Sequence, residues 1–179
     1  TGIVGIGQRG SEGEAADEAE ITQWFKEFPG AQLAIVTGVV SGITVIDFDD
    51  LNADWPPAGS ELPTDAVVRT PRGGAHYYLP YVPGSRNSAG VLAKGVDVRS
   101  EGGYVLCPPS RTEKGQYSFS VGDFFSIGGL RNAGPPAEWI RAAVLGGVVA
   151  ASGPLAEQER SERSTSEPQT AAWLSAALL

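Results

Sequence analysis

The chain has 179 residues, of which 41% are hydrophobic, and it carries a formal net charge of −8 with a pI near 4.6. This charge argues against a protein that coats nucleic acid through a broad basic surface, but it leaves room for a narrow basic channel or a metal-mediated phosphate site. A single Cys and a single His exclude an internal disulfide and a Cys/His zinc site, so we expect no zinc.

No apolar run in the sequence is long enough to span a membrane, and no basic-then-apolar signal segment opens it. We therefore expect a cytoplasmic protein, in a bacterium or a bacterial host, with no membrane contact. Met is absent from the sequence, which predicts a processed chain or an excised fragment of a longer protein.

The first third of the chain predicts one helix and two strands. Large apolar residues recur at helical spacing within residues 15–28 and predict an amphipathic helix that a Pro-Gly pair ends. β-rich sequence follows over residues 31–38 and 42–49, and the second of these strands is expected to be buried on at least one face. Residues 50–64 hold three prolines and predict a loop.

Short strands dominate the rest of the chain. They are predicted over residues 66–70, 75–80, 95–100, 104–108 and 116–120. The Glu-Gly-Gly sequence between 95–100 and 104–108 is typical of a hairpin that pairs these two strands.

A helix is predicted over residues 136–150, a mobile polar linker over 152–170, and an apolar segment at the end of the chain. Because strands dominate and helices flank them, the expected fold class is α+β. We expect a catalytic domain over residues 1–140, with a truncated N-terminus as an open alternative, and a helical and linker extension over 141–179.

Two acids, Asp47 and Asp49, end the apolar strand over residues 42–49. Side chains alternate along a strand, so both acids share one face, with Cα atoms roughly 6–7 Å apart. Carboxylates this close repel each other unless a cation lies between them, and Mg²⁺ or Mn²⁺ suits all-oxygen ligands. The alternative is a pair of solvated acids at a strand end.

The only His of the chain, His76, enters a strand directly after Gly73-Gly74. The glycines allow the backbone to approach another group closely, and Arg72 precedes them. His76 and Arg72 could each donate a hydrogen bond to a phosphate oxygen. The alternative is a hairpin turn with a core His that bonds the backbone.

A third acid, Asp97, lies between Val96 and Val98. If the two valines face the core, Asp97 and Arg99 share the opposite face, where Asp97 could join the metal site and Arg99 could neutralise a phosphate. The alternative is an Asp97–Arg99 ion pair on an exposed face, worth about 0–1 kcal/mol. Cys107 is expected to be a small buried residue without chemistry.

The order of these motifs resembles the primase–polymerase domain of the archaeo-eukaryotic primase superfamily, and most of all the bifunctional primase/polymerase N-terminal (Prim-Pol) domains of phage and plasmid replication proteins. Asp47 and Asp49 match an acid-x-acid strand, Gly74 and His76 a small residue-x-His motif, and Asp97 an acid after an apolar residue. The PPS at residues 108–110 and the sequence WFKEFPGAQLAIVTG also match. The resemblance covers about residues 15–140.

The resemblance implies an RRM-like sheet joined to a smaller α/β unit, with the site in the cleft between them. It implies that Asp47, Asp49 and Asp97 hold two divalent metals, Mg²⁺ or Mn²⁺, as catalytic residues with His76. His76 and Gly74 belong to its nucleotide-binding motif, and Arg72 and Arg99 are candidates for contact with the same nucleotide. Expected partners are a single-stranded or primed DNA template, a dNTP or NTP, and a helicase on the same polypeptide or in the same replisome.

The expected function is therefore that of a template-directed nucleotidyltransferase, a DNA polymerase that also starts chains in many members of the family. Two alternatives stay open. A metal-dependent phosphodiesterase or nuclease could use the same acids and His to shorten a primer, and a catalytically silent module could bind single-stranded DNA in a replisome.

Overall fold

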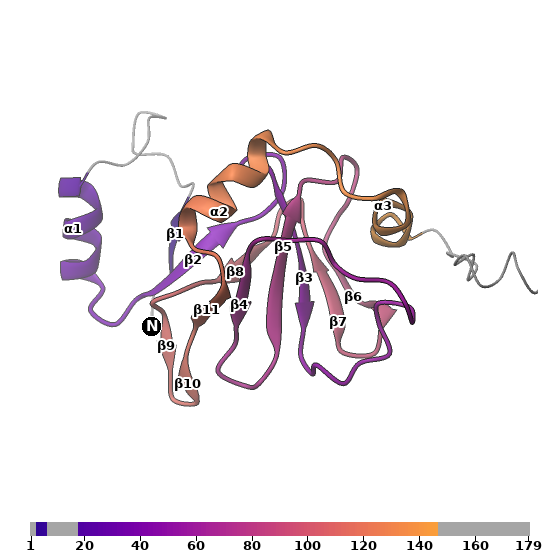
Figure 1. The fold of residues 1–179 in the computed structure, drawn as a ribbon. Coiled ribbons are helices and arrows are strands. Elements are labelled where there is room, and N and C mark those ends of the chain that lie inside the picture. Colours follow the sequence, from indigo (N-terminus) through magenta and orange to yellow (C-terminus); the bar gives the residue numbers. More distant parts are fainter. Residues whose placement is uncertain (1–2, 7–17, 147–179) are drawn as a thin grey trace, which may run out of the picture. The chain divides into compact units, whose positions relative to one another are not determined.

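The computed structural model describes residues 3–6 and 18–146. Short strands dominate these residues, with helix α1 after the first strand and the helices α2, η1 and α3 after the last one (Figure 1). None of the described helices is long and apolar enough to cross a membrane. The predicted linker over 152–170 and the apolar segment that follows it lie outside the described residues.

The strands are β1 (Ile3–Ile6), β2 (Gln32–Val36), β3 (Ile43–Phe48), β4 (Val67–Arg69), β5 (Ala75–Pro80), β6 (Ser88–Ala93), β7 (Val96–Arg99), β8 (Tyr104–Leu106), β9 (Arg111–Thr112), β10 (Gly115–Gln116) and β11 (Ser118–Val121). The helices are α1 (Glu18–Glu27), α2 (Phe124–Gly129), the 3₁₀ helix η1 (Leu130–Asn132) and α3 (Glu138–Val144).

Six strands form an antiparallel sheet in the order β11-β4-β5-β3-β7-β6. A smaller sheet has the order β1-β2-β8, in which β1 and β2 are parallel and β2 and β8 antiparallel. The pair β9–β10 forms a separate hairpin. The expected α+β class is confirmed, and the two sheets set the frame for the site.

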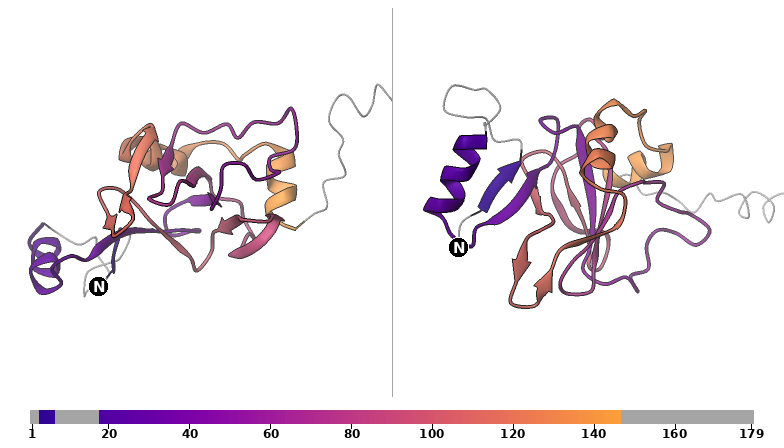
Figure 2. Two further views of the ribbon diagram at one scale, coloured as in Figure 1. Left: turned by 90° about the horizontal axis from the view of Figure 1, so that it is seen from below. Right: turned by 60° about the vertical axis from the view of Figure 1, so that its left-hand side comes forward.

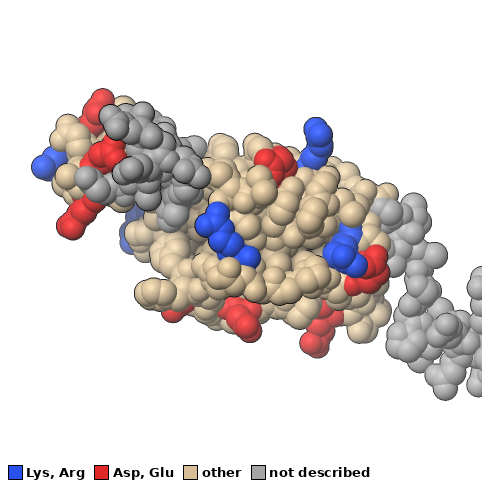
Figure 3. Space-filling view, turned by 90° about the horizontal axis from the view of Figure 1, so that it is seen from above, with Lys and Arg blue, Asp and Glu red and all other residues tan. Residues whose placement is uncertain are grey.

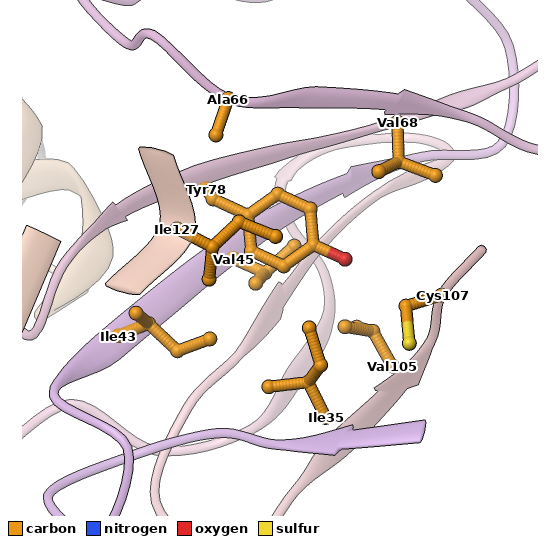
Figure 4. Packing of buried hydrophobic residues seen from close by; sticks show 9 residues of the cluster. All are labelled: Ile35, Ile43, Val45, Ala66, Val68, Tyr78, Val105, Cys107 and Ile127. Atoms are coloured by element: carbon orange, nitrogen blue, oxygen red, sulfur yellow. The ribbon is translucent and has the colours of Figure 1, made fainter. Parts of the chain in front are cut away.

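The core lies between the two sheets. Ile35 of β2 and Val105 of β8 belong to one buried cluster with residues of the large sheet, among them Val45 of β3 and Tyr78 of β5 (Figure 4). Ile127 of α2 joins the same cluster. This face of the large sheet is therefore covered by the small sheet and by α2.

The opposite face of the large sheet is buried as well. Ile46 and Val98 point away from the small sheet and are fully buried. Trp139 of α3 stacks 5.9 Å from Trp55, which in turn lies 5.9 Å from Phe48 of β3, so α3 and the loop before β4 cover this side. β3 is thus buried on both faces over Ile43–Ile46, which explains its nearly continuous apolar sequence.

The predicted pairing of residues 95–100 with 104–108 is wrong. β7 pairs with β3 and β6, whereas β8 pairs with β2 of the other sheet. The glycines do turn the chain, because the Gly103 N–H donates to the Ser100 carbonyl, but the Thr37 N–H donates to Gly103 and draws the chain towards β2. β6, absent from the prediction, is the hairpin partner that β7 uses instead.

Both predicted helices exist, with shorter bounds in the described residues. α1 covers Glu18–Glu27 of the expected 15–28, and α3 covers Glu138–Val144 of the expected 136–150, whose last four residues are outside the description. The apolar residues of α1 are not buried: Ile21 and Phe25, for example, are 41% and 37% exposed. Helix α2 was not predicted, and Asp123 caps it by accepting a hydrogen bond from the Ser126 N–H.

Gly74 lets the start of β5 lie against the end of β3, a close approach that the pair Gly73-Gly74 predicted. A Cβ at this position would lie 1.9 Å from the carbonyl oxygen of Phe48. The turn before β5 also needs Gly73, whose φ is +91°. The end of β3 and the start of β5 can therefore lie against each other only while residue 74 has no side chain.

The thiol of Cys107 is expected to be inert in the folded protein. Cys107 is fully buried, and burial raises the pKa of its thiol to about 12. We expect native protein to react with a disulfide reagent at pH 8 far more slowly than protein unfolded in denaturant, as the release of the coloured thiolate would measure. Rapid stoichiometric labelling of the native protein would contradict this packing.

Gly74→Ala is expected to lower the free energy of unfolding by about 1–3 kcal/mol, because the new methyl group collides with backbone that cannot yield easily. Gly134→Ala is the matched control, since a Cβ there meets nothing within 4 Å. Urea unfolding of both variants measures the difference, and equal stabilities would show that the Phe48 carbonyl can move aside.

Candidate functional site

Three titratable side chains form a row across the middle of the large sheet. Asp47 of β3 is the register partner of His76 on β5 and of Asp97 on β7. Register partners on antiparallel strands point to the same face, with Cβ atoms about 4.5–5.5 Å apart. The sheet therefore brings together an imidazole and two carboxylates from segments that are far apart in the sequence.

Arg99 lies on the same face as this row, two residues beyond Asp97 on β7. Its Nη2 lies 2.7 Å from Asp97 Oδ2, and its Nε lies 3.5 Å from Asp47 Oδ2. The pattern of β7 is the predicted one, with Val96 and Val98 fully buried and Asp97 and Arg99 on the other face. The Asp97–Arg99 ion pair, which the sequence analysis gave as an alternative, is thus present, and Arg99 also contacts Asp47.

His76 is buried and faces Asp47. Its Nε2 lies 3.4 Å from Asp47 Oδ1, and its ring packs 5.8 Å from that of Tyr117. Its Nδ1 is buried and has no hydrogen-bond partner among the described residues. The imidazole is therefore turned towards the acid and not towards a backbone carbonyl.

The pKa of the Asp47 carboxyl shows the balance of these contacts. Burial by itself raises the pKa of Asp47, but the hydrogen bond and charge of His76, together with the charge of Arg99, outweigh it and hold the pKa below its ordinary value of 3.8. Burial and the Asp47 charge raise the pKa of the nearby Tyr117 hydroxyl, while Arg72 opposes the rise. Asp47 is thus an ionised acid at neutral pH.

Two hollows meet at this row. Hollow 1, with a volume of about 420 Å³, is lined by Asp47, Phe48, Asp49, Thr70, Pro71, Arg72, His76, Thr112, Glu113, Lys114 and Tyr117. Hollow 2, of about 360 Å³, is lined by Asp47, His76, Asn87, Arg99, Gly102, Gly103, Tyr104, Val105, Leu106 and Tyr117. Asp47, His76 and Tyr117 line both, so they form the ridge between the hollows.

The predicted residues other than Asp97 and Gly74 line one or both of the two hollows. Asp49 is exposed in the bend after β3 and lines hollow 1 with Arg72, whereas Arg99 lines hollow 2. Gly74 lines neither hollow. It is the close-packing residue against Phe48 and supports the turn that carries Arg72.

Sequence reasoning missed Lys114 and Tyr117. Lys114 is in the turn of the β9–β10 hairpin, which lies beside the turn between β4 and β5 (Figures 1 and 2), with Gly115 packed near Pro71. The Glu-Lys-Gly sequence at 113–115 signals such a turn, although nothing local shows which surface it covers. Tyr117 follows directly and faces His76.

Charged side chains do not gather into a basic surface on the face drawn in Figure 3, where Lys and Arg of the described residues are spread among Asp and Glu. This arrangement fits the net charge of −8. Three cations line the two hollows, namely Arg72 and Lys114 in hollow 1 and Arg99 in hollow 2.

The donor chemistry of the row fits a hard divalent cation. Asp47 and Asp97 present carboxylate oxygens from adjacent strands, and such oxygens are the ligands that Mg²⁺ and Mn²⁺ prefer. Asp49 lines the same hollow as Asp47. Within residues 3–6 and 18–146, no group of three His, Cys, Asp or Glu side chains is close enough to hold one ion, and Arg99 lies against both members of the acid pair.

Comparison with known proteins identifies the family. No curated protein matches the sequence. The sequence profile of bifunctional DNA primase/polymerase N-terminal domains matches residues 4–139, which is most of the chain and includes every residue of the site. The chain therefore belongs to the family of bifunctional DNA primase/polymerase N-terminal (Prim-Pol) domains.

Proposed function

We propose that this primase/polymerase-type domain is a template-directed nucleotidyltransferase that extends a primer by two-metal phosphoryl transfer. In this reaction the 3′-oxygen of the primer bonds to the α-phosphorus of a nucleoside triphosphate, the bond to the bridging oxygen breaks, and pyrophosphate leaves with its electron pair. The proton of the 3′-hydroxyl is lost to solvent or to a nearby base.

One observation carries the proposal: Asp47 and Asp97 are register partners on the central strands, with His76 beside them and a hollow on each side. Polymerisation brings two separate substrates to one acidic centre, namely a strand end and a nucleotide. Two hollows that share a ridge of Asp47, His76 and Tyr117 suit that requirement better than one closed pocket.

Asp47, Asp49 and Asp97 would hold the divalent cations. Mg²⁺ or Mn²⁺ bound there would lower the pKa of the 3′-hydroxyl and stabilise negative charge on the phosphates of the nucleotide. Asp47 suits this role because its carboxyl stays ionised at neutral pH and lines both hollows. Its position on a strand buried on both faces fixes its direction.

Hollow 1 is proposed to take the triphosphate. Arg72 and Lys114 supply cationic donors at its wall, contributed by two turns that lie side by side. His76 lies beside Asp47 and lines the same hollow as these donors, so its imidazole could donate to a phosphate oxygen there. Hollow 2, lined by Tyr104 and Arg99, is left for the strand end.

The wider setting is proposed from the family alone. Family members of this type act in phage and plasmid replication, with a single-stranded or primed DNA template and a helicase on the same polypeptide or in the same replisome. Strand synthesis from an existing primer is the activity that we propose for the described residues.

Asp47→Asn and Asp97→Asn are each expected to lower the rate of primer extension by at least about 100-fold, because each removes a carboxylate ligand while its volume is kept. Gel electrophoresis of a labelled primer on a DNA template, with dNTPs and Mg²⁺ or Mn²⁺, measures the rate. Asp50→Asn is the matched control, since Asp50 is exposed, caps its own loop through the Asn52 N–H and lines neither hollow.

Extension at the wild-type rate by either variant would remove that acid from the site. A primer that becomes shorter in the presence of wild-type protein and metal would favour the nuclease alternative. A primer that is bound but neither lengthened nor shortened, with or without the acids, would favour a silent binding module.

Lys114→Ala is expected to raise the KM for the nucleotide about three- to tenfold with little change in kcat, since Lys114 is exposed and would act on phosphate as one screened cation. Lys94→Ala, in the exposed turn between β6 and β7, is the control for loss of charge. Steady-state extension kinetics on a fixed primer separate the two constants. An unchanged KM would place the triphosphate away from the β9–β10 hairpin.

A further inference from the structure

Arg99 occupies the position between the two acids that face each other. Its guanidinium spans them, with Nη2 2.7 Å from Asp97 Oδ2 and Nε 3.5 Å from Asp47 Oδ2. Asp97 is further engaged through Oδ1, which accepts a hydrogen bond from the Gly90 N–H at 2.8 Å. The guanidinium is therefore the counter-ion of the acid pair.

The sheet makes such a counter-ion necessary. Like charges directly opposite each other on adjacent strands destabilise a sheet, and both carboxyl groups are mostly buried, with 19% and 16% of their side chains exposed. Water alone screens such a pair poorly. A positive group that reaches both acids offsets their repulsion, and Arg99 is the residue that does so.

The backbone next to Arg99 is anchored by hydrogen bonds, whereas its side chain is partly exposed to a hollow. The following Ser100 is fully buried: its N–H donates to Asn87 Oδ1, and its carbonyl accepts from Thr37 Oγ1 at 2.6 Å. The side chain itself is 36% exposed and lines hollow 2. A rotation about its side-chain bonds can carry the guanidinium out of the acid pair without any change in the strand.

We propose that Arg99 is a positioning residue: it holds the two acids in place in the metal-free protein and moves away from them when a divalent cation binds. When a divalent cation binds Asp47 and Asp97, Arg99 turns from the acids into hollow 2, where its guanidinium faces the phosphates of the bound strand. This inference rests on the proposed function, because it assumes a divalent site at the acids. It adds a competition between Arg99 and that cation.

Affinity for Mn²⁺, measured by electron paramagnetic resonance of free Mn²⁺ in the absence of nucleotide and DNA, tests the proposal. Arg99→Gln is expected to bind Mn²⁺ about three- to tenfold more tightly than the wild type, since the partly exposed guanidinium no longer competes with the cation for the two acids. Arg69→Gln, an exposed arginine on β4 of the same sheet that lines neither hollow, is expected to match the wild type.

Arg99→Lys guards against a variant that fails to fold. A lysine keeps the positive charge but cannot bridge two acids with a planar fork, so its Mn²⁺ affinity is expected between those of wild type and Arg99→Gln. In a direct readout, Mg²⁺ is expected to shift the Nε–H resonance of Arg99 in ¹⁵N NMR spectra of the wild type, and not in those of Asp47→Asn.

The outcomes separate the two proposals. If wild-type protein binds Mn²⁺ and Asp47→Asn does not, the metal site stands; unchanged or weaker binding by Arg99→Gln then overturns the role of Arg99 alone. If the wild type does not bind Mn²⁺, or if Asp47→Asn binds it equally well, both the proposed metal site and the role of Arg99 are wrong.

Discussion

Two carboxylates that face each other across adjacent strands are the constraint on which the site depends. The register of β3 against β7 pairs Asp47 with Asp97, and neither side chain can leave the shared face without a break in the sheet. Such a pair costs stability unless it is compensated. His76 from one side and Arg99 from the other supply that compensation, so the same row of contacts stabilises the sheet and assembles the site.

Much of the site could be predicted because the geometry of strands is local. The two-residue period of β7 places Val96 and Val98 in the core and Asp97 on the other face, and the glycines before His76 mark a close approach that Gly74 makes to the Phe48 carbonyl. The face that a side chain takes within one strand, the position of a tight turn and the α+β class can therefore be predicted from the sequence.

What could not be predicted depends on contacts between distant segments. Glycines 102 and 103 signal a turn, but the choice of β2 as the partner of β8 is made by hydrogen bonds from Thr37, more than sixty residues away. Asp47 also shares its face with the core residue Val45, and only the end of the covering sheet lets that face open into a hollow. Lys114 enters the site through the packing of one turn on another.

Because β3 is buried on both faces, the strand register that places the acids cannot shift gradually. A slip of β3 by a single residue would exchange its two sides, turning Asp47 towards Trp55 and placing Ile46 or Phe48, depending on the direction, opposite His76. No gradual sliding connects the two arrangements, since each intermediate leaves ladder groups unbonded. The spacing of the acids is therefore a discrete property of the fold, which substitution of side chains can adjust and movement of strands cannot.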